Sequence, residues 1–198
     1  MICHEHKCIF IHIPRTAGSS VEQWICGQDW WDVDPPTKHL TASQAKARYA
    51  DHWDDYFKFS IVRNPWARMM SCLAYPDYFG VKLVDGTLDF TGYEQRFGTP
   101  LTLEIDYRFH QREEVLRKTH TDGRVYLNVL DEPLDFVGRF EHLEKDTALI
   151  AERLVLATPF RVSTEAAPLD YRRVFNDDAL NWVAKSFRDD IAKFSYAY

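Results

Sequence analysis

The chain has 198 residues, of which 45% are hydrophobic and 15% aromatic, and this composition excludes a disordered or low-complexity protein. The length suits one domain, which we expect to span residues 1–198. The formal net charge of −6 argues against a general nucleic-acid-binding protein, because such proteins usually carry a basic surface.

The N-terminus lacks the pattern of a signal peptide, and no apolar run has the length of a transmembrane helix. We therefore expect a cytoplasmic protein without a membrane span. The four cysteines, Cys3, Cys8, Cys26 and Cys72, show no regular spacing of a disulfide framework, which predicts free thiols in a reducing compartment. His4 and His6 lie between the first two cysteines and offer metal ligands, but the spacing matches no closed site, so we expect no metal.

The hydrophobic pattern predicts alternating strands and helices in the first half of the chain. Residues 8–13 are apolar enough for a buried strand, and a loop and a helix over about 21–25 follow it. Residues 57–62 are rich in β-branched and aromatic side chains and predict a second strand.

Two further helices have recognisable starts. Thr41 and Gln44 have the spacing of a capping box, which predicts a helix over about 42–50. Asn64 can cap another helix, with Pro65 at its first position, where a missing N–H has no cost.

The second half continues the alternation. Residues 124–130 and 135–140 predict strands, and residues 143–154 and 180–194 have apolar side chains at helical spacing, with Asn176 as a cap for the last helix. Strands that alternate with helices predict an α/β fold of three layers, with a P-loop-like central sheet that is mainly parallel and flanked by helices.

A loop with the sequence PRTAGSS, residues 14–20, lies between the first predicted strand and the first predicted helix. A loop at such a junction directs backbone N–H groups and the positive end of the helix dipole at one point. Gly18 allows the backbone to approach a ligand closely. The loop also contains hydroxyl donors and a fixed positive charge, on Thr16, Ser19, Ser20 and Arg15. These features indicate a phosphate-binding loop that is not a Walker A motif, and an ordinary capped helix start remains the alternative.

A second basic segment follows the strand predicted over 57–62. Arg63 lies at the end of that strand, and Arg68 and Ser71 share one face of the next helix. Ligands of open α/β sheets bind at the carboxyl ends of strands, so Arg63 and Ser71 are candidates for a second phosphate at the same edge. The alternative is a solvated arginine pair.

Four segments in order are similar to motifs of one family. Residues 12–20 resemble its HIPKTAGTS loop, and residues 57–75 resemble its FxFVRNPWxRxxSxY segment. Residues 135–144 are similar to DFIGRFENLE, and residues 190–196 to a terminal DxxxFGY. The chain thus resembles the sulfotransferases that use 3′-phosphoadenosine-5′-phosphosulfate (PAPS), and most closely the carbohydrate branch, sulfotransferase family 2. The likeness is weakest over residues 76–123.

This resemblance implies a role for each matching residue. The 5′-phosphosulfate of PAPS would be held by backbone amides of residues 16–20, which include Ala17 and Gly18, and by the side chains of Thr16, Ser19 and Ser20. Arg63 and Ser71 would hold the 3′-phosphate. The family has a catalytic lysine where this chain has Arg15, which keeps the positive charge but cannot donate a proton.

His39 is the candidate for the base that takes the proton of the acceptor hydroxyl. It precedes the helix capped by Thr41, and residues 38–42 resemble the GHLTA-like stretch that carries a histidine in the family. A histidine that merely packs at a helix start is the alternative, and Glu22 is a competing base.

The acceptor is expected to be a hydroxyl compound, most simply a carbohydrate. Candidates for contacting it are aromatic residues and a polar patch, namely Trp30, Trp31, Tyr49, Arg108, His110, Gln111 and Arg112. The expected activity is transfer of a sulfuryl group from PAPS, with 3′,5′-ADP as product and no metal. A small P-loop kinase, or a catalytically degenerate nucleotide-binding protein on the same fold, remains an alternative.

Overall fold

The structure is a computed structural model, and it describes residues 1–73, 83–84, 87–88, 123–162, 171–173, 175 and 177–198. Its internal contacts divide the chain into two compact units. The first unit comprises Met1–Arg63 and Val129–Ala166, and the second comprises Asn64–Asn128 and Ala167–Tyr198. The predicted phosphate-binding loop, Arg63 and His39 all lie in the first unit.

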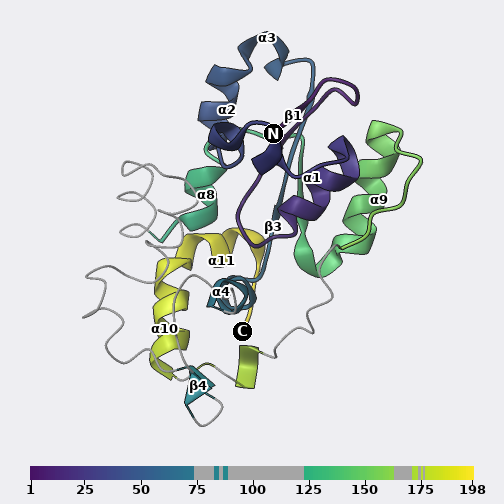
Figure 1. Cartoon of the computed structure of the whole chain (residues 1–198). Coiled ribbons are helices and arrows are strands. Elements are labelled where there is room, and N and C mark those ends of the chain that lie inside the picture. Colours follow the sequence, from purple (N-terminus) through teal and green to yellow (C-terminus); the bar gives the residue numbers. More distant parts are fainter. Residues whose placement is uncertain (74–82, 85–86, 89–122, 163–170, 174, 176) are drawn as a thin grey trace. The chain divides into compact units, whose positions relative to one another are not determined.

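A mostly parallel sheet of four strands forms the centre of the first unit (Figure 1). Its order is β1 (Ile2–Cys3), β2 (Cys8–Ile11), β3 (Phe57–Val62) and β6 (Phe136–Arg139). The last three strands run parallel, and β1 pairs antiparallel with β2. This confirms the predicted α/β fold, and the strands predicted over 57–62 and 135–140 are present.

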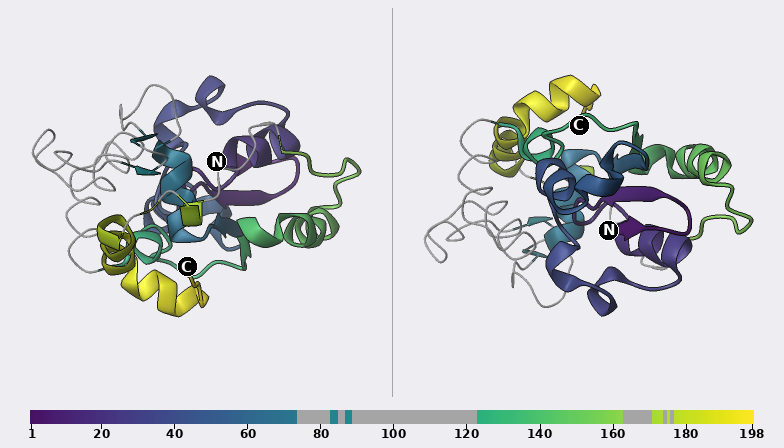
Figure 2. Two further views of the ribbon diagram at one scale, coloured as in Figure 1. Left: turned by 90° about the horizontal axis from the view of Figure 1, so that it is seen from below. Right: turned by 90° about the horizontal axis from the view of Figure 1, so that it is seen from above.

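Two helices pack into the apolar core of the first unit. They are α1 (Gly18–Cys26) and α9 (Leu143–Leu154), and both views of Figure 2 show them on the same side of this unit. Phe10 of β2 stacks on Phe59 of β3, with ring centroids 5.0 Å apart, and Ile150 of α9 belongs to the same buried cluster. Burial of each such side chain contributes roughly 2 kcal/mol, which fixes both helices to the sheet.

The helix predicted over 42–50 is present as α2 (Ala42–Arg48), and α3 (Ala50–Trp53) follows it. Its capping box forms as predicted, since the Thr41 hydroxyl accepts from the Gln44 amide at 3.3 Å and the Gln44 side chain accepts from the Thr41 amide at 3.1 Å. The remaining helical turns of the first unit are η1 (Trp30–Asp32), η2 (Pro35–Thr37) and η3 (Phe140–His142).

The second unit begins with α4 (Pro65–Leu73), which starts as predicted. The Asn64 side-chain oxygen accepts from the amides of Trp66 at 3.1 Å and Ala67 at 3.2 Å. Arg68 of this helix is not a solvated cation, because it is 1% exposed and its guanidinium lies 5.7 Å from the ring centroid of Tyr126. The other elements of this unit are β4 (Leu83–Val84), β5 (Thr87–Leu88), η4 (Tyr171–Arg173), α10 (Asp177–Ser186) and α11 (Arg188–Phe194).

Two expectations for the second half of the chain were wrong. Residues 124–130 form a helix, α8 (Val125–Val129), because Asp190 accepts from the amides of Tyr126 and Leu127 and so satisfies its first turn. The segment 180–194 is divided between α10 and α11, which meet at Phe187. The polar patch over 108–112 and the cap at Asn176 lie outside the described residues.

Within the described ranges, every helix is too short or too polar to cross a membrane.

The buried carboxyl of Asp190 predicts a pH-dependent contribution to stability. Burial raises the pKa of Asp190 to about 7, although the amides of Leu127 and Tyr126 and the charge of Arg68 favour its ionised form. The folded state therefore binds this proton more tightly than the unfolded state, and its stabilising effect is lost as pH rises through 7. Replacing Asp190 by Asn should destabilise the protein more at pH 5 than at pH 8, by about 2 kcal/mol.

Urea denaturation at the two pH values measures this difference. Asp189→Asn is the control, because Asp189 lies next in sequence and pairs with Arg188 at the surface. An equal cost of Asp190→Asn at both pH values would contradict the prediction.

Candidate active site

The loop predicted to bind phosphate leaves the carboxyl end of β2 and enters α1 at Gly18. Arg15 and Ala17 have φ angles of 68° and 70°, in the left-handed region that non-glycine residues rarely adopt. Left-handed residues in such a loop turn successive backbone N–H groups toward a common concavity, where an anion can accept from them. The N-terminus of α1 follows directly, and its first N–H groups and the positive end of its dipole favour an anion there.

The hydroxyl side chains of the loop have different surroundings. Thr16 is fully buried and its hydroxyl donates to the Ile13 carbonyl at 2.8 Å, so it braces the loop from within. Ser20 is buried, whereas Ser19 is partly exposed and its oxygen lies 3.4 Å from the Lys38 ammonium. Ser19 is therefore the loop hydroxyl that is tied to a charged side chain.

Arg63 reaches the loop from the next strand. β2 and β3 are parallel neighbours, so their carboxyl ends lie at one edge of the sheet. Nη1 of Arg63 donates to the Arg15 carbonyl at 3.1 Å, and its guanidinium lies 4.0 Å from the ring centroid of Phe140. The structure thus brings Arg63 to the loop within the first unit. Ser71 belongs to α4 of the second unit.

The first half of α1 carries a fully buried carboxylate, that of Glu22. One oxygen of Glu22 accepts from Nδ1 of His12 at 2.7 Å, and the other accepts from Nζ of Lys38 at 2.6 Å and from the Trp30 amide at 3.0 Å. Burial alone would raise the pKa of Glu22, but His12 and Lys38 hold it below its ordinary value. Because both oxygens are engaged inside the protein, Glu22 is placed to organise the site and not to meet an acceptor.

The ring of His12 occupies the space in which a side chain at position 18 would lie. A Cβ atom on Gly18 would come within 1.9 Å of Nε2 of His12. Burial lowers the pKa of His12, although Glu22 opposes this, so the imidazole is neutral and donates from Nδ1 to the carboxylate. A glycine is thus needed at position 18 because the His12 ring approaches the backbone there. From the sequence, we expected a bound ligand to make this close approach.

His39 lies on the other side of His12. The two rings are 4.5 Å apart, and Nδ1 of His39 is 3.1 Å from the His12 carbonyl oxygen. A carbonyl oxygen only accepts, so Nδ1 of His39 carries the proton and Nε2 is the nitrogen with a basic lone pair. The imidazole is 7% exposed, and Trp31 packs edge-on against it with ring centroids 5.6 Å apart.

The aromatic residues predicted to contact an acceptor differ in exposure. Trp30 is buried and its indole N–H donates to the Thr37 hydroxyl at 2.8 Å, which makes it part of the core. Trp31 is 42% exposed and lies next to His39, whereas the ring of Tyr49 is partly buried. Trp31 is therefore the aromatic residue of this set that combines exposure with proximity to the candidate base.

Three of the four cysteines lie on β1, β2 and α1. Cys3 and Cys8 are opposite each other across β1 and β2, and Cys26 contacts the sulfur of Met1 at 3.5 Å. All three are free thiols. Over the residues that the structure describes, no three His, Cys, Asp or Glu side chains are grouped to bind a metal ion.

A family model described as "Sulfotransferase family" matches residues 1–82. This segment includes the loop, Arg63 and His39, whose arrangement around one sheet edge is described above. Residues 1–82, which make up less than half of the chain, are therefore similar to the sulfotransferase family. No curated protein and no solved structure matches the chain significantly.

Sequence reasoning about this segment missed two residues of the candidate site. Lys38 was noted only as the neighbour of His39, and its buried ion pairs come from partners 16 and 9 residues away in the chain. The sequence gives His12 no role beyond its place at the start of the segment 12–20, and its contacts with Glu22 and Gly18 are visible only in the fold. Two signals could have identified them. His12 is a polar residue at the end of an apolar run, and Lys38 is a charged residue within the stretch 38–42.

The contact between Gly18 and His12 yields a testable prediction. Gly18→Ala would press a methyl group into an imidazole that Glu22 holds in place, so we expect a loss of about 3 kcal/mol of unfolding free energy. Thermal denaturation of the protein and its variant measures the loss.

A double-mutant cycle supplies the control for this prediction. In a His12→Ala background the methyl group meets no ring, so the cost of Gly18→Ala should largely disappear. The same cost in both backgrounds would show that the contact does not explain the glycine.

Proposed function

We propose that this protein transfers the sulfuryl group of PAPS to a hydroxyl group of an acceptor, and that the acceptor is a carbohydrate. The observation that carries the proposal is the meeting of Arg63 with the loop of residues 12–20 at one sheet edge, inside the segment that matches the sulfotransferase family. The family match supports sulfotransfer in general, and the donor, the acceptor class and the base are our proposal.

The donor set of the loop fits a phosphate-type anion. It combines the amides after two left-handed residues, the N-terminus of α1, the Ser19 hydroxyl and a nearby arginine. These groups would hold the 5′-phosphosulfate of PAPS, and Arg63 would hold the 3′-phosphate. PAPS supplies the sulfuryl group, and the fixed charge of Arg15 would stabilise the phosphate as it leaves.

The tautomer of His39 supports its role as the base. With the proton on Nδ1 held by the His12 carbonyl, Nε2 can take the proton of the acceptor hydroxyl while the acceptor oxygen bonds to sulfur and the bond from sulfur to the 5′-phosphate oxygen breaks. Glu22 is the weaker candidate, because its two oxygens are already engaged by His12, Lys38 and the Trp30 amide.

Turnover of labelled PAPS with pooled glycan acceptors tests the proposal. We expect His39→Ala to lower the rate of sulfate transfer by about 100-fold or more, because a positioned base contributes on this order. Arg63→Ala should weaken binding of 3′,5′-ADP by about 10-fold or more, because it removes a charge-assisted phosphate contact.

Matched controls come from exposed residues of the same types. His142→Ala and Arg48→Ala change a surface histidine and a surface arginine of the first unit, and both variants should retain the wild-type rate. If His39→Ala and Arg63→Ala transferred sulfate at the wild-type rate, the site assignment would be wrong.

Calorimetry distinguishes a protein that uses PAPS as donor from a kinase that uses ATP. Wild-type protein should bind 3′,5′-ADP without added Mg²⁺ and more tightly than it binds ATP. Tighter, Mg²⁺-dependent binding of ATP would favour a phosphotransferase, and binding of 3′,5′-ADP without transfer to any acceptor would indicate a degenerate enzyme.

A further inference from the structure

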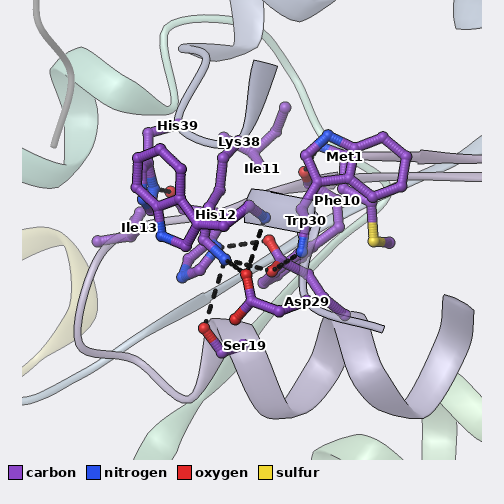
Figure 3. A network of polar contacts seen from close by, with 12 residues as sticks. Met1, Phe10, Ile11, His12, Ile13, Ser19, Asp29, Trp30, Lys38 and His39 are labelled. Carbon is purple, nitrogen blue, oxygen red and sulfur yellow. Dashed lines mark hydrogen bonds and ion pairs between the residues drawn. The ribbon is translucent and has the colours of Figure 1, made fainter. Parts of the chain in front are cut away.

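The ammonium group of Lys38 points toward Asp29 and Ser19 (Figure 3). The residue is 1% exposed, and Nζ donates to Glu22 at 2.6 Å, to a carboxylate oxygen of Asp29, and to the Ser19 hydroxyl at 3.4 Å. A lysine is seldom buried this completely unless charged partners compensate for the loss of water. Here it has two carboxylate partners, so one positive charge lies between two negative charges.

The balance of charge in this cluster depends on Lys38. Burial alone would raise the pKa of Asp29, but Lys38 and other donors hold it below its ordinary value, and the pKa of Glu22 is lowered as well. Both carboxylates are therefore ionised, and His12 is neutral. The cluster carries one net negative charge with the lysine in place, and it would carry two without it.

These carboxylates lie close to the position at which the loop would bind an anion. Glu22 is four residues into α1, one turn from its start at Gly18, and Asp29 contacts the hydroxyl of Ser19 in the first turn. Charges that are buried or partly buried are screened weakly by salt and solvent. Two uncompensated carboxylates at this depth would oppose an anion at the N-terminus of α1.

We propose that Lys38 is a positioning residue of the loop, which neutralises Glu22 and Asp29 beneath the start of α1 and so allows Ser19 and the neighbouring amides to accept an anionic donor. The inference rests on the proposed function in one respect, namely that the anion is the phosphate end of PAPS. The lysine acts through the charge of the cluster and through Ser19, and it does not need to touch the donor.

Ser19 connects this cluster to the ligand side of the loop. Its oxygen accepts from Nζ of Lys38 at 3.4 Å, and its hydroxyl group is one of the neighbours that lower the pKa of Asp29. With both partners present the hydroxyl is held between a cation and an anion. Without the lysine, Asp29 would be the one charged partner of Ser19 among these residues and would hold its proton away from a ligand.

Isothermal titration calorimetry with two probes tests the proposal. The probes are 3′,5′-ADP, the product of the proposed reaction, and inorganic pyrophosphate, which has the charged end without the nucleoside. Lys38→Met should weaken binding of both probes by about 10-fold or more, and the loss should largely persist as salt is added, because buried charges are screened weakly. Lys46→Met is the control, because Lys46 is an exposed lysine that pairs with Glu132.

A charge-restoring variant separates shielding from direct contact. Lys38→Met combined with Asp29→Asn returns the cluster to one net negative charge, so binding should recover to within about threefold of wild type if the charge balance decides it. Failure to recover, with the fold confirmed by circular dichroism, would overturn the proposal and indicate that Lys38 contacts the donor directly.

Asp29→Asn alone keeps the proposal testable if Lys38→Met does not fold. This variant removes one carboxylate from a partly exposed position, and we expect tighter binding of both probes than in wild type. Unchanged or weaker binding in Asp29→Asn would overturn the shielding role.

The two probes also separate this inference from the proposed function. If pyrophosphate binds with the expected dependence on Lys38 but 3′,5′-ADP does not bind, the PAPS assignment fails and the role of Lys38 stands. If 3′,5′-ADP binds equally well to wild type and Lys38→Met, the role of Lys38 fails and the proposed function stands. If neither probe binds to wild type, both are overturned.

Discussion

The buried carboxylate of Glu22 is the constraint on which the organisation of the site depends. A charge without water must be paired, and Glu22 is paired from two directions, by His12 at the end of β2 and by Lys38 in the segment before α2. The Trp30 amide, which lies between α1 and Lys38 in the chain, donates a third hydrogen bond to this carboxylate. One side chain of α1 therefore sets the positions of a strand end, a loop and the histidine that follows Lys38.

This arrangement explains how an acidic protein can contain the sheet edge that we propose to bind an anion. The parallel pairing of β2 and β3 brings the loop and Arg63 to the same side, where Arg63 donates to the Arg15 carbonyl. The negative charges of Glu22 and Asp29 lie underneath, with Lys38 between them. Local charge at the loop is thus governed by buried ion pairs, and the net charge of the chain is a poor guide to it.

Predictions of helix caps were correct where the residues that bond to each other are close in sequence. The capping box of Thr41 and Gln44 and the cap of Asn64 on α4 both form as predicted, because each joins atoms within one helical turn. The segment 124–130 failed for the opposite reason. Its short apolar run suits a strand or a helix, and the choice is made by Asp190, which lies more than 60 residues away and satisfies the first amides of α8.

The sequence by itself determined the fold class, the strand–loop–helix junction around Gly18 and the candidate roles of Arg63 and His39, because these follow from hydrophobic period, turn chemistry and ordered motifs. Only the tertiary structure decided that His12 fills the space beside Gly18, that Glu22 is engaged on both oxygens, and that Lys38 is buried against it. The spacing of residues along the chain predicts contacts only between residues that are a few positions apart. The compensation of buried charges depends instead on which distant segments the sheet brings together.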